Sequence, residues 1–372
     1  MKIDAVRAFK VTGPADVPAI EERSSHRPGA PLSAIYIEIG TDEGVTGLFG
    51  PLFEETAFIV VKKLRPWLLG QNPLAGEKLW DILYRQDRHS HKGYEMMAIS
   101  VVDNALWDLR GKAFGRPVHE LLGGPTRDRV DCYASLLGHA QDMGRVREIA
   151  AQAVERGFKA QKWFFRNGPA QGIDGMNKNV ELVRTVREVV GSRSEIMLDC
   201  GRGWNTGYAI RMLERLQEYD PRWLEEPVPP VRVNDMVHIR RNSHIPIASG
   251  EHAYTRWGFL ELLQAEAIDV IQADPDWCGG ISELTKIAHL ASAYGRTVFP
   301  HGHSINAAIQ TIAAQSPEVC PMAEYIWKTQ PMKQWFHKDY VEPKNGAIVL
   351  SSRPGLGVEL DEAKIERRED LF

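Results

Sequence analysis

The chain has 372 residues, enough to bury one barrel-sized core together with a second, smaller one. Its net charge of −4 comes from 45 basic and 49 acidic side chains. This balance lacks the excess of positive charge that is typical of proteins that bind nucleic acid or a membrane surface. The start, MKIDAVRAFKVTG, reads as a strand without a leader pattern, no apolar run approaches membrane-spanning length, and the four cysteines show no CxxC pairing. We therefore expect a cytoplasmic protein with reduced thiols, and its composition is compatible with a small anionic substrate.

Residues 1–124 are expected to form a small α+β domain. The first 50 or so alternate in the manner of antiparallel strands, with TDEG (41–44) as a hairpin turn. From residue 54 onward, apolar side chains recur every three or four positions, which indicates helices. Gly115 and Pro117 are predicted to end the last long helix.

Residues 125–344 alternate between strand and helix patterns, which predicts a (β/α)8 barrel of the TIM type. The expected strands are VDCYASL, FKAQKWFF, EIMLDC, RWLEEP, IPIASG, VIQAD, RTVFPH and PMAEYI. After the second of them, RNGPAQGIDGMNKN (166–179) reads as a Gly-rich insert, and the eighth strand is not followed by an obvious helix. Residues 345–372 return to strand-and-turn patterning and are expected to pack back onto the first domain.

Three carboxylates stand where consecutive apolar runs of this predicted barrel end, namely Asp199, Glu225 and Glu251, at two equal intervals of 26 residues. Each alone is equally well explained as a helix N-cap or a loop residue. The even spacing favours another interpretation, because consecutive barrel strands deliver side chains at their C-terminal ends to one face. Hard oxygen ligands select Mg²⁺ or Mn²⁺ over zinc, so the spacing predicts a site for one divalent ion.

Two longer stretches, ISVVDNALWDLRGKAFGRPVHELLGG (99–124) and PGLGVELD (354–361), frame the predicted barrel. They resemble the signatures of the enolase superfamily, within it the mandelate racemase-like group of acid-sugar enzymes, at the junction of capping domain and barrel and at the carboxy-terminal return to the cap. The runs GEHAYTRWGFLELL, IQADPDWCGGISE and VFPHGHS resemble the rhamnonate dehydratase branch most. The resemblance covers nearly the whole chain. It implies a capping domain built from residues 1–124 and 345–372, one Mg²⁺ per subunit and a homo-oligomer.

The resemblance also implies a base. Asp274 and His301, at the ends of the sixth and seventh strands, match the group's His–Asp dyad. An imidazole titrates near neutrality and a carboxylate neighbour fixes its tautomer, so His301 is expected to move the substrate's proton. His303 and Asp276 remain rivals for these two roles. Glu324 in the eighth strand matches a carboxylic acid that hydrogen-bonds the substrate carboxylate in the group.

The second strand departs from the group's pattern. Where the group commonly has Lys-x-Lys, this chain has Lys162, Trp163 and Phe164. Phe164 cannot accept a proton, which weakens racemase and cycloisomerase interpretations. Lys162 remains as a cation that can neutralise a substrate carboxylate, and Lys159, its alternative, starts the strand and is expected to lie away from the site.

The expected function is therefore dehydration of an aldonate-type acid sugar to a 2-keto-3-deoxy acid through an enediolate. The alternatives are a racemase or epimerase that uses His301 and Lys162 as opposed acid and base, and a non-catalytic sugar-acid binding or regulatory protein. The polar stretch EERSSHRPGAPL (21–32) is either an exposed linker or a lid, and as a lid it brings His26 and Arg27 to the substrate's distal hydroxyls.

Overall fold

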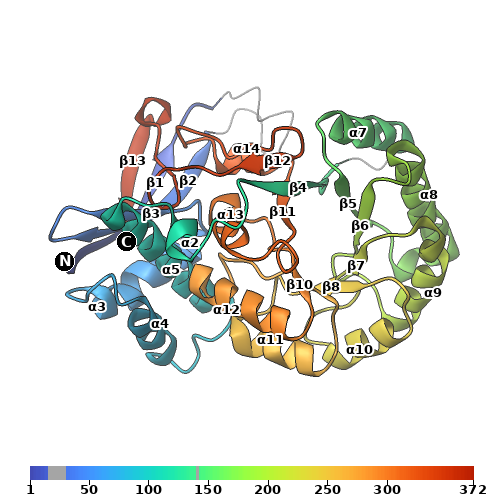
Figure 1. The fold of residues 1–372 in the computed structure, drawn as a ribbon, viewed down its shortest axis with the longest axis horizontal. Helices are drawn as coiled ribbons and strands as arrows, with labels where there is room; N and C mark the ends of the chain where they lie inside the picture. The colour runs from blue at the N-terminus through green and yellow to red at the C-terminus, as the bar shows by residue number, and fades with distance from the viewer. Residues whose placement is uncertain (16–30, 140–141) are drawn as a thin grey trace.

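Two large hydrophobic cores divide the chain in the computed structural model, which describes residues 1–15, 31–139 and 142–372. The smaller core lies between an antiparallel sheet and a set of helices near the two chain ends. The larger core surrounds a ring of strands (Figure 1). The predicted barrel with an α+β cap is confirmed.

The cap sheet has the strand order β13-β1-β2-β3 within the described residues. The last strand of the chain therefore pairs antiparallel with the first, Ala8 opposite Leu371. Gly44, with φ +78°, makes the predicted turn between β2 and β3. The elements of this part are β1 (Ile3–Thr12), β2 (Ser33–Thr41), β3 (Thr46–Phe49), α2 (Glu54–Ile59), the π-helical turn η1 (Val60–Leu64), α3 (Arg65–Leu68), α4 (Gly76–Arg85), α5 (Gly93–Phe114), α6 (Val118–Leu121) and β13 (Arg367–Leu371).

Helix α5 is the longest element of the cap and is buried along most of its length. Its apolar residues pack against the sheet, while Ser100, Asp103 and Asn104, also buried, face the barrel helix α12 (Gly280–Ala293). The helix ends at Gly115, which adopts a left-handed conformation with φ +63° that only glycine takes without strain. The predicted end of the helix is confirmed.

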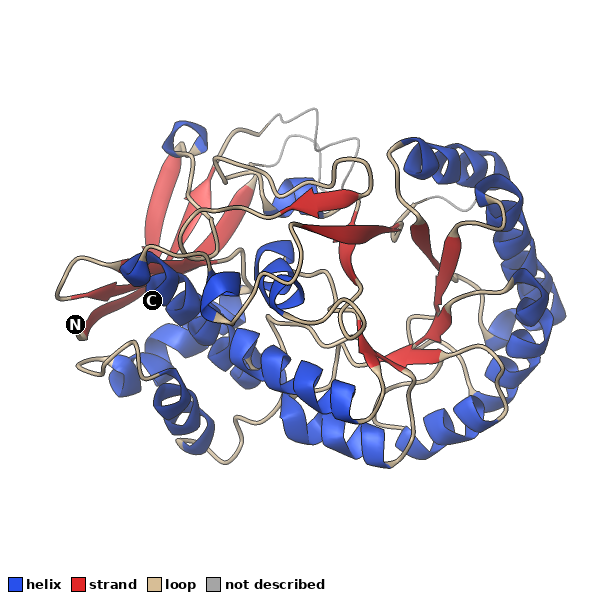
Figure 2. Ribbon diagram, viewed as in Figure 1, coloured by secondary structure: helices blue, strands red, loops and turns tan. Residues whose placement is uncertain are grey.

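Eight parallel strands within the described residues form one curled sheet in the order β10-β9-β8-β7-β6-β5-β4-β11, and helices cover its outside (Figure 2). Seven of them lie within one of the predicted runs, and β4 begins one residue before its run, at Arg129. The strands are β4 (Arg129–Ser135), β5 (Ala160–Phe164), β6 (Glu195–Asp199), β7 (Trp223–Glu225), β8 (Ile247–Ser249), β9 (Val270–Ile271), β10 (Thr297–Val298) and β11 (Met322–Ile326). The remaining elements are α7 (Met143–Glu155), η2 (Pro169–Gln171), α8 (Gly172–Val190), α9 (Thr206–Leu216), η3 (Gln217–Tyr219), α10 (Val233–Arg241), α11 (Thr255–Gln264), α12, α13 (Ile305–Ala314), α14 (Gln330–Lys333), β12 (Ala347–Val349) and η4 (Glu362–Lys364).

Two local expectations need correction or refinement. The predicted Gly-rich insert at 166–179 is wrong for half of its length, because α8 already begins at Gly172. The tail of the chain does not contact the cap alone: β12 pairs antiparallel with β4 of the barrel before β13 reaches β1. No helix among the described residues is both long and apolar enough to cross a membrane.

The inside of the barrel is closed by a layer of apolar side chains, one from each of most strands. At its centre the ring of Trp223 meets Phe299 edge to face, with 4.9 Å between centroids, and the ring centroid of Tyr133 lies 5.7 Å from that of Trp223 and 6.3 Å from that of Phe299. The layer consists of Tyr133, Ala160, Met197, Trp223, Ala248, Val270 and Phe299, with Met322 packed against it. A filled interior leaves the strands' C-terminal ends as the place for a site.

Candidate active site

The candidate site is formed by the next layer of inward-facing side chains, which lies between this apolar layer (the plug) and the C-terminal ends of the strands. Side chains two residues apart on a strand point to the same face, so residues two positions beyond the plug also face the barrel axis. Seven of these eight positions carry polar side chains, and the eighth is a glycine followed directly by Glu251. They are Ser135, Lys162, Asp199, Glu225, Gly250, Gln272, His301 and Glu324.

Lys162 is fully buried at the centre of this layer. Its Nζ lies 2.8 Å from Glu225 Oε1, 2.8 Å from Glu324 Oε1 and 4.0 Å from Asp199 Oδ2. Burial alone lowers the pKa of Lys162, but the charges of Glu225 and Glu324 outweigh that effect and raise it well above its ordinary value. The two neighbouring carboxylates therefore favour the charged form of the lysine. Phe164, two residues further, packs its ring against Gly201 instead of offering a second amine.

Asp199 and Glu225 end adjacent strands and are in register with each other. Burial raises the pKa of Asp199 to about 6 and that of Glu225 well above its usual range, although Lys162 offsets part of this. Glu225 Oε2 also accepts hydrogen bonds from Gln272 Nε2 at 2.6 Å and Trp223 Nε1 at 3.2 Å. The raised pKa values show that one lysine does not compensate these buried charges fully.

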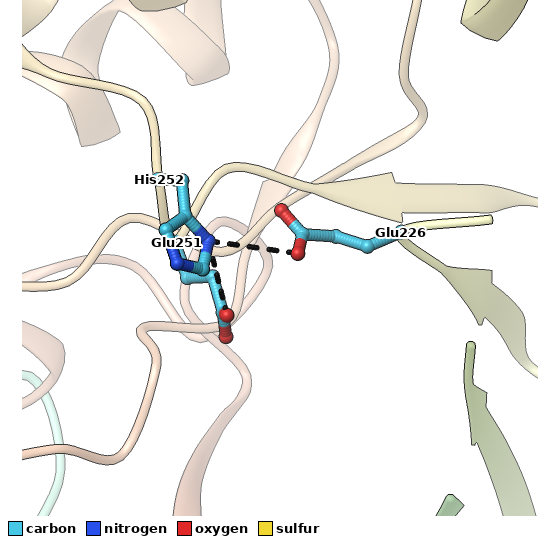
Figure 3. A group of neighbouring side chains, drawn as sticks. All are labelled: Glu226, Glu251 and His252. Carbon is cyan, nitrogen blue, oxygen red and sulfur yellow. Dashed lines mark ion pairs between the residues drawn. The ribbon is translucent and has the colours of Figure 1, made fainter. Parts of the chain in front are cut away.

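Glu251 turns away from that pair toward two histidines. His252 Nδ1 lies 3.1 Å from Glu251 Oε1 and 3.6 Å from Glu226 Oε2, and Figure 3 shows the three side chains pointing at one another. Hydrogen bonds to Glu226 and Glu251 raise the pKa of His252 to about 9. Arg202 extends the cluster, with 2.8 Å between its NH1 and His252 Nε2.

His301 stands on the other side of Glu251. Its Nε2 is 3.2 Å from Glu251 Oε2, and its Nδ1 is 2.5 Å from Asp274 Oδ2. Burial lowers the pKa of His301, but the charge of Glu251 and the hydrogen bond to Asp274 raise it to about 10. Glu251 is the largest raising cause, so neutralisation of Glu251 brings the histidine toward the range where it works as a base.

The loop that carries His301 is held by its backbone. The amide of His301 donates to Ala273 O at 3.1 Å, and the amide of Gly302 donates to Glu324 Oε2 at 2.9 Å. A Cβ on Gly302 would come 2.7 Å from the Glu324 carbonyl oxygen, so only glycine fits here. Glu324 is thus fixed between this loop and Lys162, and Lys162 lowers its pKa against the opposing effect of burial.

A second histidine–carboxylate pair lies beside the first. His303 Nδ1 is 2.6 Å from Asp276 Oδ2. The rivals considered from the sequence therefore form a pair of their own beside His301 and Asp274. Within the described residues, groups with ligand atoms close enough to share a metal ion are Asp274 with Asp276 and His303, and Glu226 with Glu251 and His252.

Sequence reasoning missed three residues of this site. Gln272 donates to Glu225, His252 contacts Glu251, and Arg202 contacts His252. Gln272 could have been found from the sequence because it lies two residues after Val270 and so faces the same side of the strand. His252 could have been found because it directly follows Glu251. The predicted lid residues His26 and Arg27 lie outside the described residues.

Comparison with known proteins identifies the class. A family model described as enolase C-terminal domain-like matches residues 145–364, and one for the mandelate racemase / muconate lactonizing enzyme N-terminal domain matches residues 28–123. The capped barrel is thus that of an enolase-superfamily enzyme. The chain belongs to the mandelate racemase / muconate lactonizing enzyme family within it.

Individual relatives cover almost the whole chain. It is 35% identical over 350 residues to L-rhamnonate dehydratase of Saccharopolyspora erythraea, spanning 91% of this chain and 86% of that protein. It is 33% identical over 380 residues to D-galactarolactone cycloisomerase of Agrobacterium fabrum, spanning 97% of each. A solved structure of a racemase from Streptomyces coelicolor A3(2) with bound magnesium has a TM-score of 0.83 at 27% identity, over 98% of each chain.

The three predicted ligands have the chemistry that a hard divalent cation requires, but within the described residues their oxygens do not converge, because Glu251 faces the two histidines. Asp199, Glu225 and Glu251 offer carboxylate oxygens, the ligands that Mg²⁺ prefers. The raised pKa values of Asp199 and Glu225 show a local deficit of positive charge that such an ion offsets. Lys162 contacts Glu225 in this structure, and the two histidines contact Glu251.

Proposed function

We propose that the protein dehydrates an aldonate-type acid sugar to a 2-keto-3-deoxy acid, with one Mg²⁺ held by Asp199, Glu225 and Glu251. The observation that carries the proposal is the buried His301–Asp274 pair, 2.5 Å apart, beside Glu251 in the layer that also contains Lys162. In that layer, Lys162 offers a cation for a carboxylate and His301 offers a proton acceptor, and both could act on the same small molecule. The relative named L-rhamnonate dehydratase supports the substrate class.

The proton beside a carboxylate is weakly acidic, so the site must stabilise the charge that its removal creates. A divalent cation supplies electrostatic stabilisation of that charge when bound. Lys162 attracts the substrate carboxylate, and Glu324 in its protonated form donates a hydrogen bond to it. His301 takes the C2 proton through Nε2 while Asp274 holds Nδ1 as a donor. The 3-hydroxyl takes a proton from an acid of the site and leaves the enediolate as water, and the enol tautomerises to the 2-keto-3-deoxy acid.

A screen of acid sugars with and without a chelator tests this proposal. We expect Mg²⁺-dependent release of a 2-keto-3-deoxy acid from at least one aldonate, detected by NMR of the product. Metal-dependent binding without turnover across the library would instead support the sugar-acid binding or regulatory alternative and overturn the proposal.

Isomerisation of an acid-sugar derivative is the second candidate. The relative named D-galactarolactone cycloisomerase, which matches 97% of this chain, favours it. Phe164 argues against mechanisms that need a second-strand base, because its ring offers no proton acceptor on that side of the substrate. Product identity separates the candidates: a product isomeric with its substrate indicates isomerisation, and a product lighter by one water indicates dehydration.

A further inference from the structure

His303 and Asp276 form a second histidine–aspartate pair with the same geometry as His301 and Asp274. Each residue lies two positions further along the same loop. Asp276 follows Asp274 by two residues, and His303 follows His301 by two. Each histidine is held through Nδ1, at 2.5 Å in the first pair and 2.6 Å in the second. In such a pair the carboxylate fixes the ring and leaves Nε2 for chemistry.

The second pair is built as rigidly as the first. Lys333 Nζ donates to the carbonyl oxygen of His303 at 2.8 Å, and Gln330 Nε2 donates to that of Gly302 at 2.6 Å. The amide of Asp276 donates to Asp274 Oδ1 at 2.7 Å. Backbone bonds on both sides therefore fix the two imidazoles relative to each other, which a role in mere loop packing does not require.

The place of His303 suits a ligand at the barrel mouth. Its ring centroid lies 5.2 Å from that of Trp277, which also packs against His301 at 5.0 Å, so the two imidazoles border the same indole. On its cap side the ring meets Phe53, 5.6 Å away. Its side chain is 15% exposed, and within the described residues Nε2 of His303 has no hydrogen-bond partner.

We infer that His303, oriented by Asp276, is the acid that protonates the leaving 3-hydroxyl, so that removal and donation of protons are divided between two histidines. This inference rests on the proposed dehydration. His301 contacts Glu251, one of the proposed metal ligands, whereas His303 lies toward the cap, against Phe53. A hydroxide is a poor leaving group, so a positioned proton donor accelerates its departure.

The proton balance closes over one turnover. His301 accepts the C2 proton, the C3–O bond breaks, and the departing hydroxyl takes a proton from His303 Nε2 and leaves as water. In the enol that remains, C3 then takes the proton from His301 and the C2 oxygen returns its proton to His303. Both histidines regain their starting state, and no oxidant or reductant is consumed.

The test separates C2 proton exchange from dehydration. In the Mg²⁺-loaded full-length protein, His303→Asn keeps a donor for Asp276 but lacks the second ring nitrogen. With a C2-deuterated acid sugar that the wild type dehydrates, we expect loss of the label to continue in this variant while dehydration falls by about 10²–10⁴-fold. The 3-deoxy-3-fluoro analogue, whose fluoride leaves without a proton, should be eliminated at the wild-type rate.

Two further variants keep the test decisive. Asp276→Asn leaves His303 in place without its charged partner and should reduce dehydration while sparing exchange. His89→Asn is the matched control, since His89 forms an exposed pair with Asp87 at 3.1 Å, far from this layer in the sequence, and should change neither readout. Wild-type dehydration in His303→Asn, or an equal loss of exchange, dehydration and fluoride release, overturns the inference. A wild type that neither exchanges nor dehydrates any acid sugar overturns the proposed function instead, and the inference with it.

Discussion

Lys162 shows how strongly a single residue constrains the chemistry. It is enclosed between Glu225 and Glu324, and their charges raise its pKa, so it remains protonated at neutral pH. A permanently protonated amine attracts a carboxylate but accepts no proton. His301 is the imidazole of this layer, and its protonation depends on its carboxylate neighbours.

This contrast predicts different behaviour for two variants. His301→Asn should abolish exchange of the substrate's C2 proton with D₂O, because it removes a general base typically worth about 10²–10⁴-fold in rate. Binding should survive, since Lys162 is untouched. Lys162→Met should instead raise KM and leave some exchange at saturating substrate. NMR of any acid sugar that turns over measures both effects. Exchange that persists in His301→Asn and disappears in Lys162→Met would make Lys162 the base.

A second residue-scale prediction concerns the metal. Glu225→Gln removes one of three proposed carboxylate ligands. Loss of a residue that only supports a metal ligand typically lowers metal affinity by about 10–100-fold, and we expect the affinity for Mg²⁺ to fall by more than that. Calorimetry measures the affinity, and circular dichroism checks that the fold is retained. Glu195→Gln, at the opposite end of the neighbouring strand β6, is the control and should bind Mg²⁺ normally. Unchanged affinity in Glu225→Gln would remove this residue from the site.

At the scale of elements, the sequence predicted the barrel strands well because each is an apolar run bounded by turn residues. It failed at the start of α8, where Gly172 and Gly175 suggested a loop. In the structure, a Cβ on Gly175 would lie 2.5 Å from the Cβ of Gln171 and 3.1 Å from that of Asn167. Glycine is needed there for close packing at the helix start, and a single sequence does not distinguish that need from flexibility.

The site was predictable to the same degree and for the same reason. Charged residues at strand ends are visible in the sequence, and the structure brings Asp274 to His301 as expected. Gln272 was missed, because its role depends on facing inward two residues after Val270 in a strand of only two residues. That orientation follows from the barrel's closure, which involves residues far apart in the chain.

A buried histidine in the segment after α14 predicts how stability depends on pH. His337 is 1% exposed, and burial together with Lys364 lowers its pKa to about 4. The unfolded chain takes up this proton near the ordinary value of 6.5, so unfolding is favoured as pH falls from 6.5 toward 4. Each pH unit in that window costs up to about 1.4 kcal/mol. His337→Gln should therefore lose less stability than the wild type between pH 7 and pH 5, measured by urea unfolding.

The exposed histidine His238 on α10 provides the comparison for this experiment. His238→Gln should keep the wild-type pH dependence. A slope in His337→Gln equal to that of the wild type would show that His337 does not titrate differently in the folded and unfolded states.

For the whole molecule, the main question is how the cap influences a site that the barrel carries. Helix α5 supplies side-chain acceptors for backbone amides at the start of α12: Ser100 Oγ for Gly279, Asn104 Oδ1 for Ile281 and Asp103 Oδ2 for Ser282, at 2.8–2.9 Å. The first amides of a helix lack partners within it, so the cap completes a barrel helix. The loop directly before α12 carries Asp274 and Asp276, which links the cap to both histidine pairs.

Asn104 makes this link most directly, because its Nδ2 donates to Pro275 O at 3.0 Å, between the two aspartates. Asn104→Ala leaves a buried amide and a carbonyl without their partner, at a cost of about 1–3 kcal/mol for each group. We expect a lower Tm and, well below that temperature, slower dehydration with little change in Mg²⁺ affinity. Asn104→Asp keeps an acceptor for Ile281 but places a buried carboxylate beside Pro275 O and Asp276, so it should be no more stable than Asn104→Ala.

The matched control removes a helix cap that has no connection to the site. The side chain of Asp142 accepts a hydrogen bond from the amide of Arg145 at the start of α7, 3.1 Å away. Asp142→Ala should cost about 1 kcal/mol of stability and leave turnover at low temperature unchanged. If Asn104→Ala behaved like this control, losing stability but keeping its turnover, the cap would stabilise the barrel without positioning Asp274 and Asp276. A selective loss of turnover in Asn104→Ala would show that the cap helps to set the geometry of the two pairs.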